Sequence, residues 1–169
     1  MRRVILISIV GLALAFGAFY AFSWPSTLAG KRGDHTGFAA SKPKVLVHTG
    51  QFLFKVTGRR DVKISTVKLM TPSPGLELVA IRIGGSEAGA LTGEHPEFEA
   101  LPRAAGAVLR AGAEGAFLVS FRALDPGRFS FEGIEVTYQT GWLTRTVKLG
   151  PRVTVRVPGP STTPSATPT

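Results

Sequence analysis

The chain has no cysteine and no asparagine among its 169 residues, and it has only three histidines. Without cysteine there is no disulfide framework, no thiolate metal site and no cysteine nucleophile. Without asparagine, N-glycosylation is excluded. His35, His48 and His95 are a thin supply of the side chain that most often serves as general base near neutral pH. The fold must therefore rest on apolar burial alone, and the composition argues against an enzyme.

Acidic residues are few beside basic ones. The formal charge is +9, and 20 Lys and Arg less Arg2 and Arg3 leave 18 against 11 Asp and Glu, a net +7 for the rest of the chain. This excess favours an acidic partner such as a wall polymer or anionic lipid headgroups. The basic residues are scattered along the chain, which is also typical of a solvated surface.

One long apolar run, residues 4–22, lies near the N-terminus and contains no charged residue. In a helix that rises about 1.5 Å per residue, its length is close to the ~30 Å core of a bilayer, so we predict a transmembrane helix within residues 1–25. Arg2 and Arg3 precede the run, and positive charge keeps that end in the cytoplasm. We therefore expect a single-pass cell-membrane protein with a cytoplasmic N-terminus and an extracytoplasmic C-terminal domain.

A cleaved signal peptide is the alternative, because Thr27-Leu28-Ala29 places small residues directly before Gly30. The run is longer than the apolar core of about 7–15 residues that is usual in signal peptides, which favours an uncleaved anchor. Both versions export the rest of the chain, one to the membrane surface and the other as a secreted protein. Either location disfavours nucleic acid as a partner.

Three segments of different character follow the apolar run. Residues 26–43 are rich in Gly, Ser, Lys and Pro without a period, so we predict a flexible linker. Residues 44–157 consist of short β-branched and aromatic runs separated by Gly, Pro and Asp, the pattern of an all-β domain. Residues 158–169 carry no charge and no large apolar side chain, so we expect a disordered Ser/Thr/Pro-rich tail.

Roughly seven to nine short strands with turns about every 8 to 12 residues suit an antiparallel two-sheet sandwich. We expect residues 44–48 and 52–56 to form a hairpin about Thr49-Gly50, and a bulge near Ser65 or Thr66 where the alternation changes phase. The last three strands should pair in sequence order because the connections are too short for crossovers; they are residues 129–138, 142–149 and 153–157.

Leu124-Asp125-Pro126-Gly127, followed by the strand that ends at Tyr138, resembles the E-to-F corner of immunoglobulin-like and fibronectin type III-like domains. In those domains a tyrosine after the turn bonds back to the corner. Here Ser130 occupies that place between Phe129 and Phe131, so the tyrosine corner is missing. The resemblance implies an immunoglobulin-like sandwich, in a superfamily whose members mostly bind or space other molecules, and it implies no activity.

The segment Glu94-His95-Pro96-Glu97-Phe98-Glu99 is the one local cluster whose carboxylates and imidazole suit a divalent cation. Its spacing matches no established metal motif, and the proline prevents a helix from aligning the ligands. A metal-dependent or hydrolytic domain centred on residues 94–99 is therefore the least favoured hypothesis. We predict no catalytic residue, no metal site and no cofactor.

These observations predict a non-catalytic, membrane-anchored protein that acts as an accessory or assembly factor for another cell-envelope protein. Val153–Val157, the last strand, is the candidate edge that adds to a partner's sheet. The alternative is a basic surface that binds anionic wall polymer or lipid headgroups. Its candidate residues, with an aromatic platform beside the turn at Gly141, are Trp142, Arg145, Lys148, Arg152 and Arg156.

Overall fold

The computed structural model describes residues 26–30, 33, 35–90 and 92–159. The predicted membrane segment and most of the predicted tail lie outside this part of the chain. No helix in the described part is long and apolar enough to cross a membrane. The described chain consists of strands and two short 3-10 turns, so the all-β prediction is confirmed.

The strands follow the alternation of β-branched or aromatic residues with polar ones between turns. In chain order the elements are β1 (Thr27–Ala29), β2 (Thr36–Ala39), β3 (Val47–Thr57), β4 (Val62–Leu69), β5 (Leu76–Gly84), η1 (Ser86–Ala90), β6 (Thr92–Gly93), η2 (Pro96–Ala100), β7 (Val108–Leu109), β8 (Glu114–Ala123), β9 (Gly127–Phe131), β10 (Ile134–Thr140), β11 (Leu143–Leu149) and β12 (Val153–Val157).

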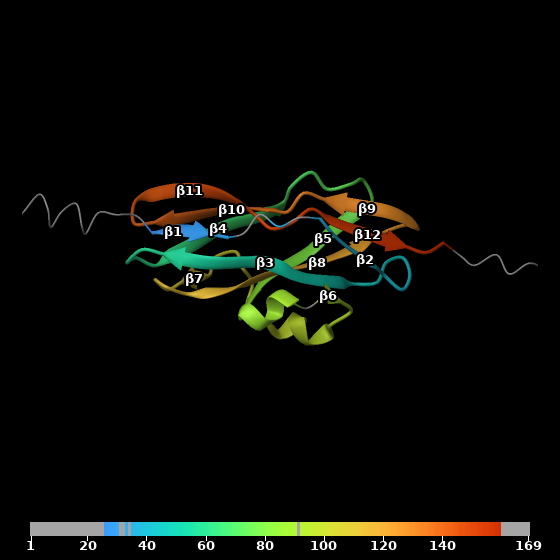
Figure 1. The fold of residues 1–169 in the computed structure, drawn as a ribbon, viewed down its shortest axis with the longest axis horizontal. Helices are drawn as coiled ribbons and strands as arrows, with labels where there is room; N and C mark the ends of the chain where they lie inside the picture. The colour runs from blue at the N-terminus through green and yellow to red at the C-terminus, as the bar shows by residue number, and fades with distance from the viewer. Residues whose placement is uncertain (1–25, 31–32, 34, 91, 160–169) are drawn as a thin grey trace, which may run out of the picture.

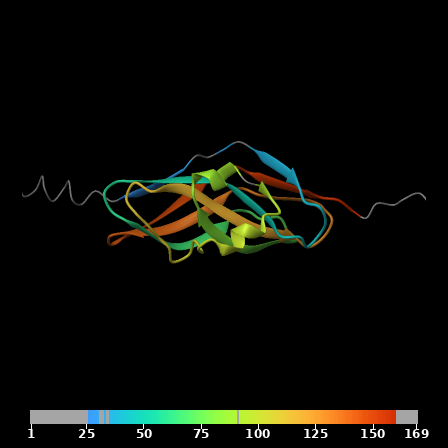
Figure 2. The same ribbon diagram turned by 90° about the horizontal axis from the view of Figure 1, so that it is seen from below.

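The described strands pair in three sheets rather than the two expected. The first has the order β1-β3-β8-β5 with β6 also on β3, the second β11-β10-β4-β7, and the third β2-β12-β9. Among these pairs only β2 with β12 is parallel. Figures 1 and 2 show an elongated molecule in which the blue and red ends of the described chain lie at opposite ends.

One apolar core joins the three sheets. The Phe131 ring of β9 lies 6.1 Å from the Phe52 ring of β3 and 5.6 Å from the Phe121 ring of β8, measured between centroids. The other face of β8 is covered as well, because Leu118 packs in a smaller cluster with Phe98 of η2. β8 is therefore buried on both faces. Full burial of a large apolar side chain contributes about 1.5–3 kcal/mol, so this strand makes a large contribution to the stability of the core.

The chain crosses from the third sheet to the second at Gly133. This residue has φ of 95°, and a Cβ there would lie 2.5 Å from the carbonyl oxygen of Leu149. Only glycine fits this position. Gly133 resets the alternation, so the apolar residues of both β9 and β10 face the core.

The bulge expected in β4 is confirmed. Thr137 and Tyr138 of β10 oppose Thr66 and Ile64, so Ser65 is the extra residue. The expected hairpin about Thr49-Gly50 is wrong, because β3 is one strand with an irregular register between Thr49 and Phe52. A Cβ on Gly50 would overlap the Ala88 carbonyl, so the glycine allows η1 to approach the strand and does not turn the chain.

The prediction of a flexible linker over residues 26–43 is wrong for the residues described there, because two strands form within it. β1 pairs with the end of β3, with Thr27 opposite Thr57, and β2 pairs with β12. Strands of three and four residues are too short to show a period in the sequence, and pairing with longer strands stabilises them.

β1 is also tied to the second sheet by buried hydrogen bonds. Leu28 is 3% exposed, and its N–H donates to the Tyr138 hydroxyl at 3.2 Å. The N–H of Ser26 donates to Thr140 Oγ1 at 3.2 Å, and Ser26 Oγ accepts from the N–H of Arg60 at 2.8 Å. The first described residues therefore belong to the domain.

The prediction that Val153–Val157 is a sheet edge is also wrong. This strand, β12, lies in the middle of the third sheet with β2 on one side and β9 on the other, and Val155 is fully buried. It does not pair with β11 as expected; β11 pairs with β10 alone. The supposed linker supplies the strand that covers this edge, so β12 cannot add to a partner's sheet.

We predict that Tyr138→Phe lowers the free energy of unfolding of the detergent-solubilised chain in urea by about 1–2 kcal/mol, because it leaves the buried Leu28 N–H without an acceptor. Thr144→Val, on an exposed position of the neighbouring strand, is the control and should change it by less than about 0.5 kcal/mol. Equal stability of the Tyr138 variant and the unsubstituted chain would mean that β1 is not held as described.

Candidate anion-binding groove

The outer face of the third sheet is polar and basic. Alternation along β12 places Val153, Val155 and Val157 in the core and turns Thr154 and Arg156 to the opposite face, where Arg156 is exposed and Thr154 is only 8% exposed. On β9 the same alternation buries Phe129 and Phe131 and turns the residues between and before them outward; these are Arg128 and Ser130.

The strand register brings these outward residues together in rows. Arg156 lies directly opposite Arg128, and Thr154 lies opposite Ser130. On the other side of β12, the parallel register places Gly37 beside Thr154 and Ala39 beside Arg156. Like charges directly opposite each other in a sheet cost up to about 1 kcal/mol, so the Arg128–Arg156 pair does not serve stability.

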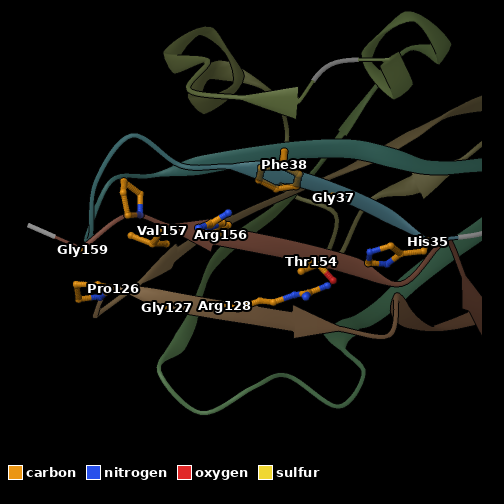
Figure 3. A pocket seen from close by; sticks show the side chains of 11 residues that line it. His35, Gly37, Phe38, Pro126, Gly127, Arg128, Thr154, Arg156, Val157 and Gly159 are labelled. Carbon is orange, nitrogen blue, oxygen red and sulfur yellow. The ribbon is translucent and has the colours of Figure 1, made fainter. Parts of the chain in front are cut away.

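The small residues of β2 leave a hollow above β12. Its volume is about 670 Å³, and His35, Phe38, Pro126, Arg128 and Arg156 are among the residues that line it. A second hollow of about 440 Å³ shares His35, Arg128 and Thr154 with the first and adds Ser130 and Arg152. Figure 3 shows His35 at one end of this face and Gly159 at the other, with Arg128, Thr154 and Arg156 between them.

We call this continuous surface the basic groove; it comprises His35, Gly37, Arg128, Ser130, Arg152, Thr154 and Arg156. Within the part of the chain that the structure describes, no acidic residue lines either hollow. The ion pairs of the described residues all lie outside the groove, at Lys55–Glu114, Lys68–Glu135, His95–Glu97 and Arg122–Glu77. The three groove arginines thus present uncompensated positive charge beside two hydroxyl groups.

This arrangement suits an anion and offers little for catalysis. A guanidinium group donates two parallel hydrogen bonds to a phosphate or carboxylate, and threonine or serine hydroxyls add single ones. Because the described residues lining the groove include no carboxylate to act with His35, we find no acid–base pair there.

The structure brings two of the five predicted surface residues together, Arg152 and Arg156. Lys148 lines a separate hollow with Glu132, and Arg145 lies on β11. Trp142 is 86% exposed in the turn between β10 and β11, so it does not pack in the core. Sequence reasoning missed Arg128 and His35. The alternation of Arg128 with Phe129 predicts its outward direction, but only the pairing of β9 with β12 places it beside Arg156.

A buried pair of polar side chains lies away from the groove. His48 Nδ1 and Ser120 Oγ are 2.8 Å apart across the β3–β8 pair, and the two residues are 1% and 2% exposed. The Phe98 ring packs against the imidazole at 5.4 Å. The sequence shows no serine near His48, because Ser120 lies 72 residues further along the chain and only the pairing of β3 with β8 brings it close. With both side chains buried, the pair is structural.

The predicted acidic cluster does not assemble a cation site. Glu94 Oε1 accepts from Ser41 Oγ at 2.5 Å, whereas His95 Nδ1 contacts Glu97 Oε1 at 3.1 Å and its ring packs on Phe98. Among the residues the structure describes, no group of three or more His, Asp or Glu side chains is arranged to hold a metal ion.

No protein-family model matches the sequence, and no curated protein is significantly similar to it. Among solved structures, the ASH/PapD-like domain 7 of human CEP192 is similar with a TM-score of 0.42 and 11% identity, over 79% of this chain and 84% of that one. The VesB protease of Vibrio cholerae has a TM-score of 0.39 and 8% identity, over 83% of this chain and 34% of that one. The secreted serine protease VesC of the same organism has a TM-score of 0.31 and 10% identity, with 82% and 24% covered. These scores are too low to assign a fold family or an activity.

We predict that His48 makes the domain less stable in acid. Burial lowers the pKa of His48, with His95 and Arg82 adding to this and Glu99 and Glu97 opposing it. The imidazole of the unfolded chain therefore binds a proton more readily than that of the folded chain. The contribution of neutral His48 to stability is complete above about pH 6.5 and is lost as the pH falls towards the lowered pKa.

The measurement is the free energy of unfolding in urea at about pH 7.5 and about pH 5. His48→Gln should show a smaller decrease between the two values than the unsubstituted chain, and His35→Gln, whose side chain is exposed, should not. The same pH dependence in the His48 variant would contradict this role.

Proposed function

We propose that the protein is a non-catalytic, membrane-anchored binding protein whose basic groove holds an extended anionic polymer of the cell envelope. The observation that carries this proposal is the pair Arg128–Arg156, two arginines in directly opposite register with no described carboxylate beside them. A cleft lined by charge of one sign raises the local concentration of ions of the opposite sign.

The spacing of the groove favours a polymer over a single small anion. Arg152 directly precedes β12 and Thr154 and Arg156 alternate along it, so successive groups on an extended chain are about 6.6 Å apart. Two adjoining hollows extend the surface across three strands. A chain of regularly repeated phosphate or carboxylate groups can engage several of these positions at once, and multivalent contact raises affinity without any single strong site.

The anchored form is the better supported of the two locations weighed from the sequence. Cleavage after Ala29 would remove Ser26 and the whole of β1, which pairs with β3 and supplies the buried Leu28. We therefore propose that the mature chain keeps residues 4–22 as its membrane anchor. The immunoglobulin-like arrangement implied by residues 124–127 stays part of this proposal.

An accessory role towards another envelope protein is the alternative. β12 is an interior strand, so such a partner would need another surface, and β11 is an edge of the second sheet. Threonine and charged residues occupy much of β11, so this edge is poorly suited to pair with a strand of a partner protein. The following experiment separates the two hypotheses.

Binding of the detergent-solubilised chain to poly(glycerol phosphate), a polymer with a regular anionic repeat, tests the proposal. We expect Arg128→Gln with Arg156→Gln to weaken binding at least about tenfold and to make it less sensitive to salt, because two charge-assisted contacts are lost. The matched control, Arg103→Gln with Arg145→Gln, removes the same charge from exposed positions outside the groove and should retain most of the binding.

Gly37→Val supplies a second test that leaves the charge unchanged. A Cβ at this position would meet nothing closer than 3.8 Å, so valine should fold normally while it fills part of the hollow. We expect weaker polymer binding at unchanged stability. Equal loss in the groove and control variants would contradict the proposal, and salt-resistant capture of one envelope protein would favour the accessory role.

A further inference from the structure

The end of the molecule where the described chain begins is formed by three tight connections around Ser26. They are residues 58–61 between β3 and β4, residues 110–113 between β7 and β8, and the two-residue turn Gly141-Trp142 between β10 and β11. Figures 1 and 2 both place these connections at the end where the blue strand begins, opposite the end where the red strand leaves. We call this surface the β1 end.

Hydrogen bonds join the connections of the β1 end into one unit. Ser26 bonds to Thr140 and to the backbone of Arg60, and Asp61 Oδ1 accepts from the N–H of Ala111 at 3.0 Å. A Cβ on Gly58, where φ is 109°, would lie 2.8 Å from the Cα of Ser26, so the two segments touch. Ser26 is completely buried and cannot swing away from the domain.

The β1 end exposes the side chains that a membrane interface attracts. Trp142 is 86% exposed, the most of any large apolar residue in the described chain. Arg59 and Arg110 are exposed on the other two connections. Asp61 is the one acidic residue within these three connections, so their net charge is positive. Tryptophan concentrates at the headgroup level of bilayers, and arginine is drawn to anionic headgroups.

The chain between the predicted span and Ser26 is too short to hold the domain off the membrane. Three residues lie between Phe22 and Ser26, and the four steps from one to the other span at most about 14 Å when fully extended. The headgroup layer on each side of the hydrocarbon core is roughly 5–7 Å thick. Trp142 is two residues from Thr140, which bonds to Ser26, so the turn lies within reach of that layer.

We propose that the β1 end is a membrane-contacting surface, with Trp142 in the headgroup layer of the outer leaflet and Arg59 and Arg110 against anionic headgroups. This inference rests on the anchored form in the proposed function but not on polymer binding. It orients the domain with its long axis away from the membrane, so the basic groove, near the end where the described chain leaves, faces the wall.

Tryptophan quenching in lipid vesicles tests this surface. The full chain carries two tryptophans, so Trp24→Phe leaves Trp142 as the single fluorophore. In vesicles of phosphatidylcholine with phosphatidylglycerol, we expect blue-shifted Trp142 emission, strong quenching by lipids brominated near the headgroup, and protection from acrylamide. The arginine and lysine positions changed in the variants below are all exposed, so these substitutions should not unfold the domain.

Charge variants identify the lipid contact. Arg59→Glu with Arg110→Glu should reduce lipid quenching of Trp142 in anionic vesicles, whereas Lys42→Glu with Arg103→Glu, at exposed positions outside the β1 end, should not. Emission typical of water with free access to acrylamide would overturn the proposal, and so would a blue shift without lipid quenching, which would indicate a protein contact. Arg128→Gln with Arg156→Gln should leave the quenching unchanged, which separates this proposal from polymer binding.

Discussion

The pairing of Thr27–Ala29 with the end of β3 is the interaction on which the rest of the account depends. Three residues would not form a strand alone, and here they are held because Leu28 is buried and its N–H reaches the Tyr138 hydroxyl. This pairing fixes the start of the domain four residues after the predicted span. A domain attached to the proposed membrane span in this way would have a defined orientation, whereas one on a flexible linker would not.

The two ends of the molecule carry different surfaces. The crossing at Gly133 divides one layer into two sheets, the second sheet near Ser26 and the third sheet near the last described residues. The Phe52 and Phe121 rings of the first sheet pack against the Phe131 ring of the third. The β1 end carries the exposed tryptophan, and the far end carries the basic groove. One rigid core therefore separates the proposed contact with lipid from the proposed contact with polymer.

The sequence predicted the class of structure and much of its local detail, including the strand pattern and the bulge near Ser65 or Thr66. These features follow from alternation within one segment. What it did not predict depends on pairing between distant segments: β2 and the interior position of β12, the register that joins His48 to Ser120, and the row that places Arg128 opposite Arg156. Two of the five surface residues proposed from the sequence, Arg152 and Arg156, line the groove. Their outward direction follows from the alternation of side chains along the extended chain.

Hydrogen–deuterium exchange of the full chain in lipid nanodiscs is the most direct test of whether residues 26–30 belong to the folded domain, with β1 paired to β3. Because the amide of Leu28 is buried and bonded to Tyr138, we expect it to exchange as slowly as the amides of β3. The Leu28 amide should also exchange faster in Tyr138→Phe than in the unsubstituted chain. Exchange of residues 26–30 at the rate of an unstructured peptide would contradict this claim, because the domain would then be free to turn relative to the proposed anchor.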